Sequence, residues 1–305
     1  MQQFNNIGFI GAGRLGGTLA EALARRGYRI AAVSSRSHAS AARLANGTGQ
    51  APLVCNSPQV VADRCDLVFI TTPDNVIKEV ADSITWRKGQ SVVHCSGALT
   101  VLALDSAARA GANVAGFHPM QTFTTANQTL DDVTIAIEGA DEIAGALARV
   151  ARDIGCKHVI LASGDKTLYH MSGVLASNYV VTLLNLAEEL WEALGISRAA
   201  GREALLTLLK GTIANIEQAG SVQALTGPIA RGDDATIAAH LERLATDAPA
   251  LLALYRELGQ LTIPIAQAKG TLDERTAQRL RAILSGPDDR SLSPRSATAP
   301  KEELR

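Results

Sequence analysis

The sequence predicts an α/β protein in which a doubly wound parallel sheet is followed by an all-α domain. Over the first half of the chain, short apolar runs alternate with helix-like stretches, which is typical of a parallel sheet with helices on both faces. From Asp165 to about Ser285 the chain is rich in Leu and Ala and has helical periodicity. We therefore expect a sheet domain over 1–162, a helical domain over 163–285 and, in a stretch rich in Pro, Ser and charge, a disordered tail over 286–305.

The expected strands are short buried runs separated by helix-like segments. The strands lie at 7–10, 30–33, 67–71, 91–94, 114–117, 133–137 and 158–161. The helices between them include 18–26, 76–84, 99–110 and 141–154. Ligands of doubly wound sheets bind outside the carboxyl ends of the strands. Several polar side chains follow those predicted ends: Thr71, Thr72, His94, Ser96 and His118.

The first expected strand leads into a glycine-rich turn that opens a helix. The turn reads Gly11-Ala12-Gly13-Arg14-Leu15-Gly16. Strand, tight turn and helix form the context that the dinucleotide-binding fingerprint requires. Gly11 permits the turn, Gly13 lets the backbone approach a pyrophosphate, and Gly16 lets helix and strand pack closely. The N–H groups of the helix N-terminus then stabilise phosphate charge, so we expect a Rossmann-type nucleotide site here.

The second strand is followed by Ser34, Ser35 and Arg36, where many such proteins carry an acidic residue. An acid would bond a ribose 2′-hydroxyl and repel a 2′-phosphate, whereas serine and arginine donate to a phosphate. NADP(H) is therefore favoured over NAD(H), the alternative being that Arg36 is a solvated loop cation. The cofactor site is further expected to include the end of the 67–71 strand: Thr71, Thr72 and Pro73.

Composition excludes several classes of protein. A length of 305 residues suits two domains. The net charge of −1 provides no electrostatic footprint for nucleic acid or an anionic membrane, and no apolar run is long enough to span a bilayer. The four cysteines have no CxxC or metal-ligand spacing, which predicts no metal site and a reducing environment. With a strand so close to Met1 we expect no signal peptide and a cytoplasmic location.

Two residues at strand ends are candidates for chemistry on a small-molecule substrate. A nicotinamide transfers hydride, and the protein must supply an acid or base that titrates near neutrality, for which histidine is suited. Pro119 holds His118 in an extended conformation, so His118 should end its strand facing the ligand crevice. Ser96 follows the preceding strand. Its hydroxyl would orient a substrate oxygen or, alternatively, cap a helix near Leu99.

A polar stripe opens the helical half. At about 100° per residue, Lys166, His170, Gly173 and Ser177 lie within roughly 60° on one helix face. The glycine would let a flat ring approach, and Lys166 or His170 would stabilise developing charge. The alternative is a solvated helix face. Asn178 falls about 120° from Lys166, towards the apolar side.

The pattern of Ser96 after one strand and His118-Pro119-Met120 after the next resembles prephenate and arogenate dehydrogenases. That resemblance implies that the serine and the histidine hold and deprotonate a substrate hydroxyl. The sequence departs from the family at residues 121–123, and no dicarboxylate-binding set is evident. We therefore extend the residue roles but not the substrate.

A second resemblance covers nearly the whole chain. The fingerprint, the 116–123 segment Gly-Phe-His-Pro-Met-Gln-Thr-Phe, His170 with Ser177-Asn178, and the 225–233 segment are similar to bacterial Rossmann-like proteins with a C-terminal domain of unknown function. Those proteins are described as predicted NADP oxidoreductases and are distant relatives of pyrroline-5-carboxylate and ketopantoate reductases in the 6-phosphogluconate dehydrogenase-like group. The resemblance implies the fold and a helical dimerisation domain. Related hydroxyacid dehydrogenases place a catalytic lysine and an asparagine on the corresponding helix, which makes Lys166 and Asn178 candidates.

We expect an NADP(H)-dependent oxidoreductase that transfers hydride to or from a small carbonyl or hydroxyl substrate, with His118 as acid or base. Alternatives are an imine reductase of the pyrroline-5-carboxylate reductase type and a non-catalytic NADP(H)-binding sensor or scaffold. A homodimer through residues 165–285 is expected, because the helical half cannot bury all its apolar faces alone. Arg231 would clamp a substrate carboxylate or, as is favoured, pair with Asp233 or Asp234.

Overall fold

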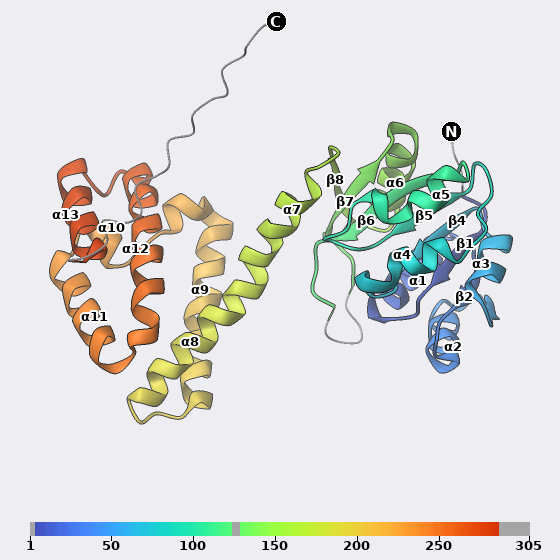
Figure 1. The fold of residues 1–305 in the computed structure, drawn as a ribbon. Helices are drawn as coiled ribbons and strands as arrows, with labels where there is room; N and C mark the ends of the chain where they lie inside the picture. Colours follow the sequence, from blue (N-terminus) through green and yellow to red (C-terminus); the bar gives the residue numbers. More distant parts are fainter. Residues whose placement is uncertain (1–3, 124–128, 287–305) are drawn as a thin grey trace, which may run out of the picture. The chain divides into compact units, whose positions relative to one another are not determined.

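The computed structural model describes residues 4–123 and 129–286, which fall into two compact units, Met1–Asn178 and Tyr179–Arg305 (Figure 1). The first unit holds a sheet and the helices around it, and the second is helical. The predicted class, a sheet domain followed by an all-α domain, is confirmed. The helix that begins at Lys166 belongs to the first unit by its contacts. The expected disordered tail, apart from Gly286, lies outside the described residues.

Within the described residues the sheet has eight strands in the order β3-β2-β1-β4-β5-β6-β7-β8. Neighbouring strands are parallel except for β6 and β7, which are antiparallel, so the predicted all-parallel sheet is parallel-dominated. The strands are β1 (Ile7–Ile10), β2 (Ile30–Ser34), β3 (Leu53–Cys55), β4 (Leu67–Ile70), β5 (Ser91–His94), β6 (Asn113–Pro119), β7 (Thr134–Gly139) and β8 (Lys157–Leu161).

Helices cover both faces of this sheet. Those of the first unit are α1 (Arg14–Arg25), α2 (His38–Gly47), α3 (Pro58–Arg64), α4 (Asp74–Asp82), a 3₁₀ turn (Val101–Leu104), α5 (Asp105–Arg109), α6 (Asp141–Asp153), α7 (Lys166–Gly173) and a π-helical segment (Val174–Asn178). Because successive strand residues face opposite sides, Phe9 packs in the core under α1 and α6, and Ile10 in the core under α3 and α4. Phe69 joins the first core by stacking on Phe9 at 5.4 Å.

Strand register brings the expected strand ends to one edge of the sheet. Ile10 pairs with Ile70, Ile70 with His94, and His94 with Gly116. The residues that follow these four positions in parallel strands therefore leave the sheet at the same edge. This is the edge where ligands of doubly wound folds bind.

Several local features differ from the predicted elements, among them the helix expected over 99–110, which is a 3₁₀ turn followed by the short α5. The strand β3 was not predicted, because its three residues lie on the sheet edge and show no alternation. Helix α1 begins at Arg14 rather than residue 18, since tertiary packing overrides the low helix propensity of its glycines. The π-helical segment interrupts the regular period that the 166–177 stripe assumed.

The second unit consists of helices. They are α8 (Tyr179–Ala193), α9 (Arg198–Ala224), α10 (Pro228–Arg231), α11 (Asp234–Asp247), α12 (Pro249–Lys269) and α13 (Glu274–Ser285). Helices α10 to α13 share a core that includes Ile237, Ile263 and Leu280, each fully buried. Gly227, the N-cap residue before α10, has φ +95°, a conformation that glycine adopts without strain.

Candidate functional site

The glycine-rich turn has the geometry that the fingerprint requires. Gly11 has φ +104°, its N–H donates to the Ser34 carbonyl at 2.8 Å, and a Cβ there would lie 2.7 Å from the Thr71 carbonyl carbon. A Cβ on Gly16 would lie 2.8 Å from the Gly11 oxygen. The Thr71 hydroxyl donates to that same oxygen at 2.7 Å. A side chain at either glycine would therefore push α1 away from the strands.

The N-terminus of α1 is open towards a cavity. A Cβ on Gly13 would meet no atom of the described residues within 4 Å, and no side chain caps the helix at this residue. The first N–H groups of a helix lack internal partners and carry the positive end of its dipole. The adjoining cavity of about 490 Å³ is lined by Ile10, Gly11, Ala12, Gly13, Ser34, Ser35, Arg36, Ser37, Ser40, Asn56, Pro58, Thr71, Thr72, Pro73 and Val80. Arg14 and Leu15 continue the turn into α1 without lining that cavity.

Polar and basic side chains border this cavity. The hydroxyls of Ser34 and Thr72 are buried and lack a hydrogen-bond partner among the described residues. Arg36 lines the wall, and Arg43, which no sequence motif indicated, donates to Ser40 of the wall at 2.7 Å. The described lining residues include no Asp or Glu. Hydroxyl and guanidinium groups are hydrogen-bond donors that can bind an anion.

Ser96 has a structural role in the loop after β5. Its hydroxyl donates to the Asp74 carboxylate at 2.7 Å and accepts from the backbone N–H groups of Ala98 at 3.1 Å and Leu99 at 2.9 Å. A hydroxyl has one donor and two acceptor positions, so these three bonds occupy it fully. Ser96 therefore fixes the turn at residues 96–99 and caps no helix, because the following 3₁₀ turn begins at Val101 with Thr100 as its N-cap. Asp74 is a partner that the sequence did not reveal.

His94 is also held in place by its surroundings. It is fully buried, its Nδ1 accepts from the Ser96 N–H at 3.2 Å, and its Nε2 lies 3.2 Å from the Thr100 carbonyl. These partners define a neutral ring with its proton on Nε2. Burial and the charge of Lys166 lower the pKa of His94 to about 4. His94 therefore braces the loop that carries Ser96.

His118 lies near the end of β6 and is close to side chains of α7 and to the loop after β5. Its Nδ1 lies 2.8 Å from the hydroxyl of Tyr169, and the two rings meet edge to face at 83°. A Cβ on Gly97 would lie 2.8 Å from His118 Nε2 and 2.8 Å from Cδ2 of His170. Only a glycine at position 97 lets both imidazoles come this close. Tyr169 and Gly97 were not predicted, since neither carries a motif of its own.

Burial determines the protonation of this pair. Burial, with smaller effects of Lys166 and His170, lowers the pKa of His118 to about 4, and Asp74 opposes the shift. Burial also raises the pKa of Tyr169 to about 12. Both side chains are consequently neutral near pH 7.

Lys166 is buried beside Gly116 of β6 and does not line the cavity that His118 lines. Its side chain is fully buried, and its Nζ has no hydrogen-bond partner among the described residues. A Cβ on Gly116 would lie 3.0 Å from that Nζ and 3.7 Å from Cβ of Glu138, itself 3% exposed. Burial lowers the pKa of Lys166, and the Glu138 carboxylate opposes this. Lys166 therefore acts on the site through its charge.

The second cavity, of about 420 Å³, is lined by His118, Met120, Gln121, Thr122, Tyr169, His170, Gly173, Val174, Ala176, Ser177 and Asn178. Of the predicted catalytic set, it brings together His118, His170 and Asn178 and leaves out Ser96 and Lys166. Asn178 reaches the same wall as His170 because the π-helical segment changes the phase of the helix. Regular periodicity placed it on the other side.

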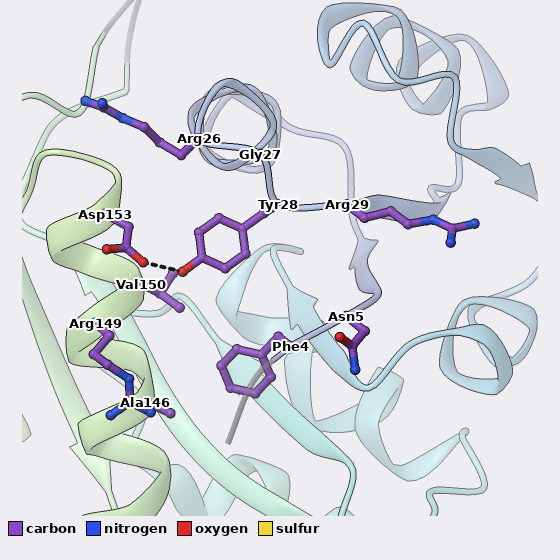
Figure 2. A pocket seen from close by; sticks show the side chains of 10 residues that line it. All are labelled: Phe4, Asn5, Arg26, Gly27, Tyr28, Arg29, Ala146, Arg149, Val150 and Asp153. Atoms are coloured by element: carbon purple, nitrogen blue, oxygen red, sulfur yellow. Dashed lines mark hydrogen bonds between the residues drawn. The ribbon is translucent and has the colours of Figure 1, made fainter. Parts of the chain in front are cut away.

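Another cavity, of about 550 Å³, lies away from these residues (Figure 2). It lies between the chain before β1, the α1–β2 junction and α6. The Tyr28 hydroxyl donates to Asp153 at 2.5 Å, and this bond ties the junction to α6. The side chains of Arg26 and Arg29 point away from the Tyr28 ring in Figure 2. We assign this cavity a structural role.

The described residues also bear on metal binding, membrane-spanning helices and the cysteines. Among residues 4–123 and 129–286, no cluster of three His, Cys, Asp or Glu side chains is arranged to hold a metal ion. Of the helices that the structure describes, none has the length and apolar character needed to cross a bilayer. The four cysteines are free and buried: Cys55, Cys65, Cys95 and Cys156.

Two family models match the chain in succession. Residues 2–119 match a Rossmann-like domain, and residues 133–262 match DUF2520, a domain of unknown function. The chain thus joins a Rossmann-like domain to a C-terminal DUF2520 domain, as its motifs predicted. No curated protein matches the chain significantly.

Solved structures share this architecture. Protein TM1727 from Thermotoga maritima is 27% identical, with 87% of this chain and 99% of that chain covered and a TM-score of 0.68. A Bacteroides fragilis protein with the provisional name NADP oxidoreductase BF3122 is 24% identical, with coverages of 85% and 98% and a TM-score of 0.65. A reductive aminase from Aspergillus terreus, in complex with NADPH and ethyl levulinate, is 14% identical, with 93% of each chain covered and a TM-score of 0.59. The last two likenesses establish the fold alone.

Proposed function

We propose that this protein is an NADP(H)-dependent oxidoreductase that transfers hydride to or from a small carbonyl or hydroxyl substrate, with His118 as the acid or base. One observation carries the proposal. A short series of neighbouring residues connects the first cavity to His118. Pro73 lines that cavity, and the next residue, Asp74, accepts a hydrogen bond from Ser96. Gly97, which follows Ser96, packs against the His118 imidazole. A cofactor extended along this edge would bring its reactive end to the second cavity.

The residues of the first cavity fit NADP(H). The N–H groups after Gly13 would hold the pyrophosphate, and Ser34, Ser35, Arg36 and Arg43 would surround the 2′-phosphate. The bound nicotinamide supplies or accepts the hydride. Two relatives of the same fold support this cofactor: one carries NADPH and the other is provisionally named for NADP.

A neutral His118 suits the part of a base, although its pKa of about 4 is lower than the near-neutral value expected from the sequence. A neutral imidazole has one N–H and one acceptor nitrogen. With Tyr169 at Nδ1, the opposite nitrogen is left to take the proton of a substrate hydroxyl during oxidation, and the imidazolium so formed returns that proton in the reverse reaction. His170 and Asn178 line the same cavity, which supports them, rather than Lys166, as the groups that contact a developing charge.

The test replaces His118 with Asn, and His240 with Asn as a matched control. His240 lies 2.7 Å from a tyrosine hydroxyl in the second unit, in the same ring geometry. NADPH oxidation is measured against 2-oxo acids, simple ketones, cyclic imines and hydroxy acids, beside a calorimetric NADPH titration. We expect His118→Asn to keep NADPH affinity and to lower turnover by about a hundredfold or more, with His240→Asn unaffected.

Other outcomes would select the alternatives. Turnover of cyclic imines that survives His118→Asn would support an imine reductase, because a protonated imine needs no strong protein base. Tight NADPH binding without oxidation of any substrate would support a sensor or scaffold. No heat with either NADPH or NADH would remove the cofactor and the proposal with it.

We also propose a homodimer formed through residues 165–285. The described helices of this region expose large apolar side chains that a soluble surface rarely leaves uncovered in such number. They include Val181, Leu194, Leu208, Ile213, Leu258 and Leu261. A light-scattering mass equal to one chain would contradict the dimer.

A further inference from the structure

Among the residues that the structure describes, the wall of the second cavity has no Asp, Glu, Lys or Arg. Its polar side chains carry imidazole, hydroxyl and amide groups. Its ionisable members are His118, His170 and Tyr169. The low pKa of His118, caused first by burial, and the high pKa of Tyr169, also caused by burial, keep these two neutral near pH 7.

Lys166 is a buried cation that does not line this cavity. Lys166 Nζ lies under Gly116 with no exposed surface, on the side where Glu138 is buried. Four other groups interact with it electrostatically: Asp74 of α4, Cys95 after β5, His94 of β5 and His118 of β6. A substrate in the cavity would not contact the ammonium, whose charge Glu138 and Asp74 oppose.

The first cavity, unlike the second, has groups that attract anions. It offers Arg36 and an uncapped helix N-terminus, which are groups that bind anions. A carboxylate bound in the second cavity would give up part of its hydration and would contact no Lys or Arg of the described wall. A neutral carbonyl or imine would lose little and would find several hydrogen-bond donors.

From this contrast we infer that the His118 cavity selects substrates whose bound part is uncharged, such as simple ketones, aldehydes, keto esters or neutral imines, over carboxylate- or phosphate-bearing analogues. The inference rests on the proposed function and names the substrate class of the same site. A cavity of about 420 Å³ accommodates a molecule of this kind.

The experiment compares matched pairs that differ in charge at one position. NADPH oxidation by the full chain is followed at pH 7.5 with 2-oxobutanoate, 3-oxobutanoate and 4-oxopentanoate, each beside its methyl ester. We expect kcat/KM to be at least tenfold higher for the esters. Equal values, or higher values for the acids, would overturn the inference but leave the proposed function standing. NADPH binding without oxidation of any ketone, imine or acid would instead contradict the proposed function.

A cation introduced into the wall of the second cavity tests whether that wall causes the preference for uncharged substrates. Val174→Arg places a guanidinium on the cavity wall, and Leu175→Arg places one on the neighbouring residue, which is 61% exposed and outside the wall. We expect Val174→Arg to lower the ester-to-acid ratio at least tenfold and Leu175→Arg to leave it unchanged. Ser177→Lys provides a second wall position should Val174→Arg fold poorly. An unchanged ratio in the folded wall variants would show that the wall does not set the preference.

Discussion

The Tyr169 hydroxyl lies 2.8 Å from Nδ1 of His118, which joins the first helix after the sheet to the end of β6. A second pair, His240 and Tyr255, repeats the geometry with a contact of 2.7 Å. The two pairs differ in their surroundings, because only His118 has Gly97 and a second imidazole against its ring in the described structure. Their likeness makes the second pair a control for the first.

Tyr169→Phe should lower kcat by about tenfold and leave the KM for substrate and the Kd for NADPH within twofold. The phenyl ring preserves the packing, but the imidazole loses the hydrogen bond that orients it, a loss of about 1 kcal/mol. Steady-state kinetics with the substrate found in the screen would measure this. Tyr255→Phe is the matched control and should retain full turnover. A similar loss in both variants would show a general effect on stability.

Gly97→Ala should abolish most turnover while keeping NADPH binding. The added methyl group would lie 2.8 Å from both His118 Nε2 and His170 Cδ2, so at least one imidazole must move. Misplacement of a catalytic group by about 1 Å can cost a hundredfold in rate. Gly145→Ala in α6 is the control, because its methyl group meets no described atom within 4 Å and should stabilise the helix by about 0.5–1 kcal/mol. Full activity of Gly97→Ala would separate Gly97 from the site.

Arg43→Met should weaken NADPH binding about tenfold or more and leave NADH binding unchanged. The guanidinium bonds Ser40 at the edge of the first cavity, where a 2′-phosphate would accept a charge-assisted hydrogen bond. Isothermal titration with both cofactors checks the prediction. Arg109→Met, an exposed change on α5, is the control. An equal loss of affinity for NADPH and NADH would show that Arg43 does not contact the 2′-phosphate.

The free energy of unfolding should fall as the pH drops from about 6.5 towards 4. His94 and His118 have pKa values lowered to about 4 by burial and by the charge of Lys166, whereas in the unfolded chain they titrate near 6.5. Between these values the unfolded state binds more protons, so acid favours unfolding by at most about 1.4 kcal/mol per pH unit for each imidazole.

Urea unfolding of the cofactor-free protein at pH 7.5, 6.0 and 5.0 measures this dependence. His118→Asn should show a shallower decline than the wild type, since one of the two imidazoles no longer titrates. His240→Asn should follow the wild type. A stability that is constant between pH 7.5 and 5.0 would show that neither histidine is held neutral.

Local patterns were sufficient for the fold class, the glycine turn and the strand ends. The short apolar runs at 7–10 and 67–70 indicate buried strands, and Gly11 and Gly16 indicate the turn, because both signals depend on residues close in sequence. The edge strand β3 is too short to leave such a signal. A constant 3.6-residue period placed Asn178 towards the apolar side of its helix, because such a period takes no account of a π turn.

What the sequence determined by itself is therefore the architecture, the glycine-rich turn and the histidine near the end of β6. Tertiary structure alone decided which polar groups meet there: Tyr169 with His118, Asp74 with Ser96, and Lys166 withdrawn under Gly116 beside Glu138. The physical reason is that hydrogen-bond partners and burial depend on contacts between residues 51 and 22 positions apart along the chain, and periodicity carries no information about such distances.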